Sequence, residues 1–68
     1  MEKQLAEQIM KLALESSQKL NEIAILSEEN SSHEEFLRVR KQVAYSIAAI
    51  LEEVLEPIYK EHPDLIPY

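Results

Sequence analysis

The stretch Ser27-Glu28-Glu29-Asn30-Ser31-Ser32 decides the fold, because it opens the one long run of the chain without an apolar residue. Serine and asparagine favour helix ends and turns over helix interiors. Asn30 is suited to the left-handed position at which many helices end. We therefore predict an interhelical loop at residues 29–32, and a loop this short makes the helices on its two sides antiparallel neighbours.

Before this loop, the sequence predicts an amphipathic helix over about residues 2–28. Apolar residues recur every three or four positions along it, which is the spacing of a packed helix. Leu14 and Ile25 fall on the otherwise polar side. The apolar arc is wide, and a helix with such an arc contacts two neighbours rather than one. It carries Met1, Leu5, Ala6, Ile9, Met10, Leu12, Ala13, Ser16, Ser17, Leu20, Ile23 and Ala24.

After the loop, the sequence predicts a second helix over about residues 33–61. Ser32 and Glu35 match a capping box at its start, and Ser31 with Glu34 offers the same pattern one residue earlier. Acidic residues in the first turn suit the positive end of the helix dipole. Both patterns place the start of the helix directly after the loop.

The second helix also has one apolar face, and Pro57 interrupts it near its end. Proline lacks a backbone donor and disfavours helical geometry at the residue before it, so the helix either stops near residue 56 or kinks and continues. We favour the kink, because Ile58 then stays on the apolar face. That face carries Phe36, Leu37, Val39, Val43, Ala44, Ile47, Ala48, Ile50, Leu51, Val54, Leu55 and Ile58.

Residues 62–68 form a tail that begins His62-Pro63 and holds a second proline and three large apolar residues. Two arrangements are open for it. The tail either folds back over the end of the hairpin and covers apolar surface there, or it is a short peptide that docks on another molecule. We favour the first arrangement.

The composition agrees with an all-α fold in a single domain over residues 1–68. The chain has no glycine, which disfavours β-hairpins and glycine-rich nucleotide loops, and it is rich in helix-forming Leu, Glu, Ala and Lys. Its formal charge of −6 disfavours nucleic-acid binding. The longest apolar stretch, Val43 to Leu51, is too short to span a membrane. These features predict a soluble, cytoplasmic protein.

A chain of 68 residues without cysteine has neither the core nor the disulfides to be stable alone, so we expect it to pair with a second copy. Two antiparallel hairpins then form a four-helix bundle, and the copies pack either with their loops at the same end or at opposite ends. This outline resembles the small dimeric hairpins of plasmid copy-number regulators, without a shared motif. The expected dimer core is Leu5, Ile9, Leu12, Leu20, Ile23, Phe36, Val43, Ile47, Ile50, Leu51 and Val54.

Arg40 is the most unusual residue, because it falls near the centre of the apolar face of the second helix. A buried guanidinium is costly unless it is paired. Three interpretations are open: the side chain reaches out to solvent at the end of the bundle, it pairs with a glutamate such as Glu28 or Glu29, or it binds an anionic partner.

The candidate partner-binding residues are Arg38, Arg40, Lys41 and Tyr45. The three cations form the only basic cluster, which is small for a nucleic-acid patch, and Glu34 is placed to pair with Arg38 along the helix. Tyr45 lies on the polar side, where an aromatic residue can mark contact with another protein.

No catalytic, metal or cofactor residues are predicted. Neither His33 nor His62 has the glutamate three residues earlier that metal sites of helical bundles use, and no nucleophile stands beside a base. We therefore expect a small interaction or regulatory protein that binds another protein as a homodimer. The alternatives are an acidic inhibitor, such as a toxin-neutralising protein, and a nucleic-acid-associated regulator that uses the basic cluster.

Overall fold

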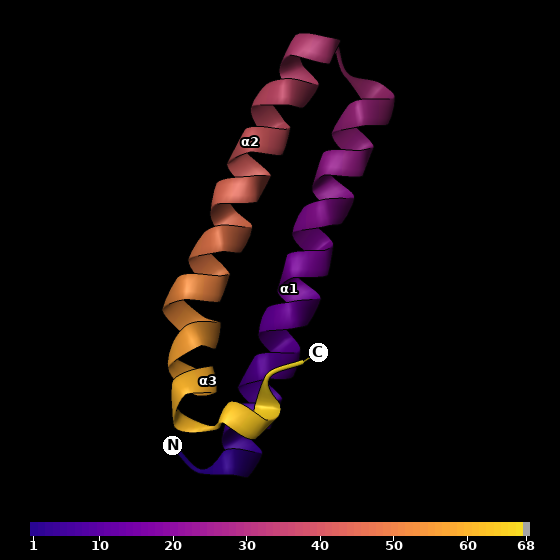
Figure 1. The fold of residues 1–68 in the computed structure, drawn as a ribbon. Helices are drawn as coiled ribbons and strands as arrows, with labels where there is room; N and C mark the ends of the chain where they lie inside the picture. Colours follow the sequence, from indigo (N-terminus) through magenta and orange to yellow (C-terminus); the bar gives the residue numbers. More distant parts are fainter. Residues whose placement is uncertain (68) are drawn as a thin grey trace.

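The computed structural model describes residues 1–67 and shows an all-α hairpin (Figure 1). The first helix, α1, spans Lys3–Asn30, and the second, α2, spans His33–Ile50. The two lie side by side and antiparallel, in a molecule that measures 45 by 19 by 15 Å. The described residues form helices and no strand, so the predicted all-α class is confirmed for them.

The connection between α1 and α2 is shorter than predicted and contains only Ser31 and Ser32. The left-handed cap predicted at Asn30 is wrong, because no residue from 1 to 67 has a positive φ. Asn30 stays helical and donates from Nδ2 to the carbonyl of Leu26 at 2.9 Å. Ser31 leaves the helix in an extended conformation, while its N–H and its hydroxyl both donate to the carbonyl of Ser27. The serine side chain satisfies the helix end, so no left-handed residue is needed.

The start of α2 follows one of the two predicted capping patterns. The hydroxyl oxygen of Ser32 accepts from the backbone N–H of Glu35 at 3.1 Å, which confirms Ser32 as the capping residue. Glu34 and Glu35 occupy the first turn, where their carboxylates face the positive end of the helix dipole. The cap and these charges fix where α2 begins.

The helix does not stop at Pro57. It widens into a π-helical turn, η1 (Leu51–Leu55), and continues as α3 (Glu56–Glu61). The N–H of Glu56 donates to the carbonyl of Leu51, five residues earlier, instead of the usual four. Because Pro57 lacks an N–H and its ring crowds the carbonyl four residues before it, a wider turn just ahead of it lets the helix go on.

The tail folds back over the end of the hairpin, which is the first of the two arrangements considered. A short 3-10 turn, η2 (Pro63–Leu65), follows α3, and this last segment crosses α1 near the end of the hairpin (Figure 1). The side chains of Leu65 and Ile66 are half-buried there. Tyr68, which the prediction included in the tail, lies outside the described residues.

The buried side chains are few and are concentrated at one end. Between residues 14 and 42 no side chain is buried. The buried residues are Ala6, Ala13, Val43, Leu55 and Ile58. Among residues 1–67, no helix is both long enough and apolar enough to cross a membrane.

Candidate functional site

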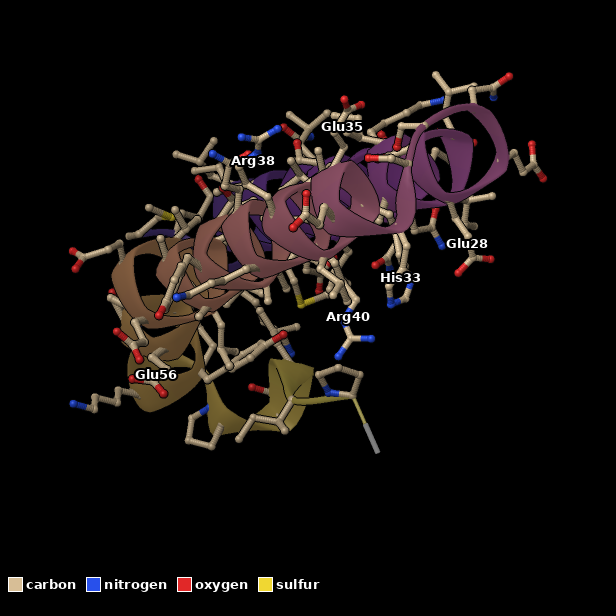
Figure 2. The ribbon with its side chains drawn as sticks, turned by 90° about the horizontal axis from the view of Figure 1, so that it is seen from above. Glu28, His33, Glu35, Arg38, Arg40 and Glu56 are labelled. Atoms are coloured by element: carbon tan, nitrogen blue, oxygen red, sulfur yellow. The ribbon has the colours of Figure 1, made fainter. Side chains whose placement is uncertain are left out.

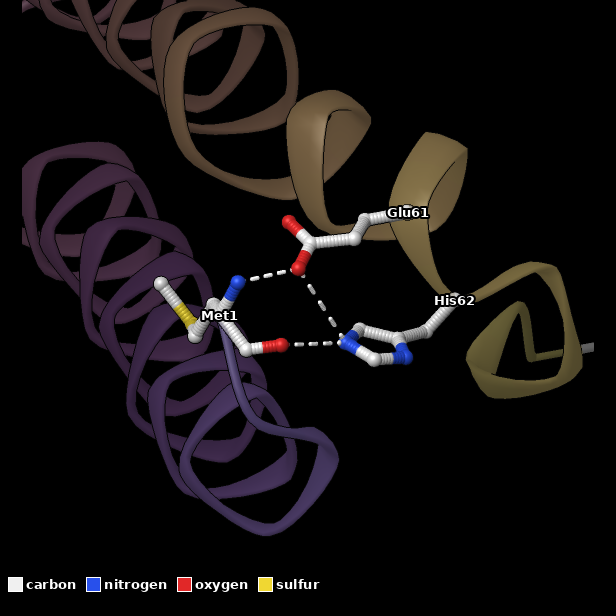
Figure 3. A network of polar contacts seen from close by, with 3 residues as sticks. All are labelled: Met1, Glu61 and His62. Carbon is white, nitrogen blue, oxygen red and sulfur yellow. Dashed lines mark hydrogen bonds and ion pairs between the residues drawn. The ribbon is translucent and has the colours of Figure 1, made fainter.

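Polar contacts tie the tail to the start of α1. The ammonium of Lys3 pairs with the carboxylate of Asp64. The N-terminal ammonium of Met1 pairs with the carboxylate of Glu61, as Figure 3 shows. The Nε2–H of His62 donates to the carbonyl oxygen of Met1 at 2.9 Å. The first and last parts of the chain are thus joined at the end of the hairpin opposite the Ser31–Ser32 connection.

The two ion pairs shift the pKa values of the side chains that form them. The hydrogen bond from Lys3 holds the pKa of Asp64 below its usual value, and the same bond raises the pKa of Lys3. The hydrogen bond from the N-terminal ammonium lowers the pKa of Glu61. All three side chains are exposed, so solvent screens each pair and the individual energies are small.

Two open grooves lie on the side of the hairpin that the tail covers. Leu65 of the tail lines the first, of about 470 Å³, together with Met10 and Leu14 of α1. The second, of about 310 Å³, lies toward the Ser31–Ser32 connection and is bordered by residues of α1 and α2. Its lining residues are Asn21, Ala24, Ile25, Glu28, Phe36 and Arg40.

The predicted basic cluster is divided between two sides of the hairpin. Figure 2 shows Arg40 pointing to the side of the tail and Arg38 pointing away from it. The Nζ atom of Lys41 lies 5.9 Å from the ring centre of Tyr45, which is itself 67% exposed. Arg38 lines a hollow with Glu34 and other polar residues at the start of α2. The four candidate binding residues therefore do not form one patch.

Arg40 is exposed, which agrees with the interpretation that its side chain reaches solvent. Within residues 1–67 it forms no ion pair, and Glu28 lies in the same groove without contacting it at ion-pair distance. Arg40 lines the second groove together with Phe36. Binding of an anionic partner there stays a prediction.

The residues expected in the dimer core fall into three groups. Val43 is buried within the hairpin itself. Six others are half-buried, namely Ile9, Leu20, Phe36, Ile47, Ile50 and Val54. The remaining four are exposed, namely Leu5, Leu12, Ile23 and Leu51. Only this last group offers much apolar surface to another molecule.

Three of these exposed residues, together with Leu26, form a line along α1 that we call the α1 stripe: Leu5, Leu12, Ile23 and Leu26. Leu12 and Leu26 are 63% and 62% exposed. At 100° per residue the stripe lies on one flank of the contact between the helices. The sequence prediction omitted Leu26, although its position three residues after Ile23 is the signal that could have found it.

The opposite flank, which we call the tail flank, carries Leu14, Ile25, Leu37, Arg40 and Leu51. Leu14 and Ile25 are the two residues that the helical pattern placed on the polar side of α1. Leu37 of α2 and Leu51 at the start of η1 lie on the same side of the hairpin as Arg40. The helix α1 thus exposes apolar residues on both flanks, whereas the exposed Leu37 and Leu51 of the second half of the hairpin lie on the tail flank.

The histidines and hydroxyls have structural contacts. His33 stands at the loop end, where its ring lies 6.5 Å from that of Phe36, and His62 stands at the tail end. The hydroxyls of Ser16 and Ser46 donate to carbonyls of their own helices. No group of three or more potential metal ligands gathers within the described part of the chain.

No family model matches the chain, and no curated protein or solved structure is significantly similar to it.

Proposed function

We propose that this protein is a small interaction protein that pairs with a second copy as a four-helix bundle and binds another protein through the surface of that dimer. The role is one of binding rather than catalysis. The absence of cysteine fits a reducing compartment, and we place the protein in the cytoplasm.

The observation that carries the proposal is the balance between buried and exposed apolar side chains. Among residues 1–67 only five side chains are buried, and two of these are alanines. Ten large apolar side chains are exposed by 38% or more. A hairpin with so small a core is marginally stable by itself, and pairing would remove from water the apolar surface that its own fold leaves exposed.

The mass in solution tests the pairing. We expect sedimentation equilibrium to return two copies at about 10 µM, and we expect the midpoint of thermal unfolding to rise with protein concentration, because pairing stabilises only the folded state. A single copy that unfolds cooperatively at a concentration-independent temperature would contradict the proposal.

The acidic surface favours a second candidate, an inhibitor that covers a basic site on another protein. Every aspartate and glutamate side chain in the described part of the chain is exposed, and only Glu22, Glu61 and Asp64 take part in ion pairs with its other residues. The free carboxylates would speed association with a cationic partner. Such binding weakens as salt rises, whereas binding through apolar surface does not, so a salt titration of a captured partner separates the two candidates.

The nucleic-acid alternative has less support. Arg38 and Arg40 point to different sides of the hairpin, and the surrounding surface is acidic. A single hairpin therefore presents no continuous basic surface along which a phosphate backbone would lie. If an RNA or DNA does shift on native gels, changing Arg38 and Lys41 to glutamate should abolish the shift.

A further inference from the structure

We infer that the second copy docks on the α1 stripe, and that the tail flank stays outside the interface. This inference rests on the proposed pairing and specifies which surface carries it. Leu5, Leu12, Ile23 and Leu26 would meet their counterparts, or neighbouring apolar residues, across a two-fold axis.

The amount of exposed surface matches the needs of such a contact. The accessible surface of the chain is 5261 Å². A compact monomer of 7.9 kDa exposes about 4,400 Å² by the usual scaling of surface with mass. The excess is roughly 850 Å², close to the area of about 800 Å² that each partner buries in a standard protein–protein interface. One added copy would therefore bring the surface per chain to that of an ordinary globular protein.

No segment of residues 1–67 covers the α1 stripe. On the tail flank, Leu65 and Leu14 line the same groove, and the tail is tied in place by Lys3 and Asp64. A second copy docking there would have to displace these contacts. The α1 stripe offers four large aliphatic side chains along most of the length of the helix without such a cost.

The two flanks also differ in charge. The grooves of the tail flank are bordered by several charged side chains, namely Glu7, Lys11, Glu15, Glu28 and Arg40. Between Leu12 and Ile23, helical register places Lys19 on the α1 stripe, with Ser16 at one edge and Glu15 at the other. Charged groups are depleted at the centres of protein interfaces because their desolvation is costly, so the α1 stripe fits a second copy better.

Ser16 and Lys19 have contacts of their own that suit an interface. The hydroxyl of Ser16 donates to the carbonyl of Leu12 at 2.9 Å, so it needs no partner from another chain. Its small side chain would let a second helix approach closely. The ammonium of Lys19 lies 3.3 Å from Glu22, and its aliphatic stem can cover apolar surface while the charge stays in solvent.

The sharpest test uses two isoleucines of α1. Ile23 lies on the α1 stripe and Ile25 on the tail flank, and their exposed fractions in the single chain are 50% and 56%. Because the chain has no cysteine, Ile23→Cys and Ile25→Cys each introduce one reporter thiol. We expect thiol alkylation of the Ile23→Cys variant to slow at least ~10-fold at concentrations where the wild type is paired, and to recover on dilution, because burial limits access to the thiol. The Ile25→Cys variant should react at the same rate at both concentrations.

The possible results separate this inference from the proposal beneath it. A wild-type protein that stays a single copy overturns both. If the wild type pairs, but the thiol of Ile25→Cys is protected and that of Ile23→Cys is not, only the assignment of the flank is overturned. Equal rates for the two variants in a paired protein overturn the assignment as well.

A charge on each flank gives a second measurement. We expect Ile23→Glu to weaken self-association roughly 100-fold, because a carboxylate would have to be desolvated in the interface. Ile25→Glu should change it less than about threefold, since surface substitutions cost little. A larger effect of Ile25→Glu than of Ile23→Glu would overturn the inference.

Discussion

The two ends of the hairpin differ in how many side chains they bury and in the polar contacts that hold them. At the tail end, Leu55 and Ile58 are buried, the tail folds over the start of α1, and the Lys3–Asp64 and Met1–Glu61 pairs hold it there. At the loop end, two serines connect the helices and no side chain from residue 14 to 42 is buried. A hairpin stays together along its length only where apolar side chains leave water, so the loop end has little of its own to hold it.

This difference shows that the chain's own contacts hold the tail end, whereas the loop end has few such contacts. Local stability follows the number of buried apolar contacts, so the loop end should open more often than the tail end. Two of the four residues of the α1 stripe, Ile23 and Leu26, lie near the loop end. A second copy on the α1 stripe would stabilise the end that needs it most.

The largest effect we expect comes from truncating a buried side chain at the tail end. Ile58→Ala should lower the free energy of unfolding by about 2–4 kcal/mol, because it removes buried methyl groups and leaves a cavity. Ile25→Ala is the matched control toward the loop end and should cost less than about 1 kcal/mol, since Ile25 is already exposed. Urea unfolding followed by circular dichroism measures both. Equal losses would show that the two ends do not differ as described.

A smaller effect is expected from the side-chain cap at the start of α2. Ser32→Ala removes the acceptor for the N–H of Glu35 and should cost about 1 kcal/mol. Hydrogen exchange should speed up in the first turn of α2. Ser46→Ala, in the middle of α2, serves as the control, because the bond from that hydroxyl goes to a carbonyl within an intact helix. A change spread evenly over α2 would argue against a local capping role.

The smallest effect concerns pH and is confined to the tail end. The pKa values of Asp64 and Glu61 are lowered in the folded protein from ordinary values of 3.8 and 4.5. A lowered pKa contributes stability that is present above the ordinary value and is lost as the pH falls through the folded value. The pKa of Lys3 is raised, so its contribution is present below the ordinary value of 10.5 and is lost at higher pH.

We therefore expect the tail to loosen as the pH falls below about 4, while the loop end keeps its exchange rates. The methyl signals of Leu65 report the tail, and those of Leu37 report the other end. Asp64→Asn should loosen the tail at neutral pH and reduce the further change on acidification. Simultaneous changes at Leu65 and Leu37 would instead indicate global acid unfolding.

Much of the fold was predictable because it depends on neighbours in sequence. The three-to-four spacing of apolar residues predicts the helices, and the capping pattern at Ser32 and Glu35 predicts where α2 begins. The end of α1 was misjudged, because Asn30 and Ser31 satisfy the helix end with their side chains instead of a left-handed residue. Pro57 left two outcomes open, since the π-helical turn that accommodates it depends on hydrogen bonds five residues apart.

The candidate site was less predictable, because helical spacing alone does not say which flank of an apolar arc a neighbour covers. Arg38 and Arg40 are close in the sequence. Residues two positions apart in a helix are separated by a rotation of about 200°, however, so the two side chains point to different sides of α2. The tie between Lys3 and Asp64 joins residues at opposite ends of the chain and has no local sequence signal.

The sequence by itself determined that this protein is helical, that its helices are two-faced and that they turn back on each other within a few residues, because backbone hydrogen bonds and capping act over three or four positions. The tertiary structure decided which apolar residues the chain buries for itself, because burial depends on what lies opposite each side chain. Ile58 is covered by the folded hairpin, whereas Ile23, equally apolar, is left half exposed on the α1 stripe.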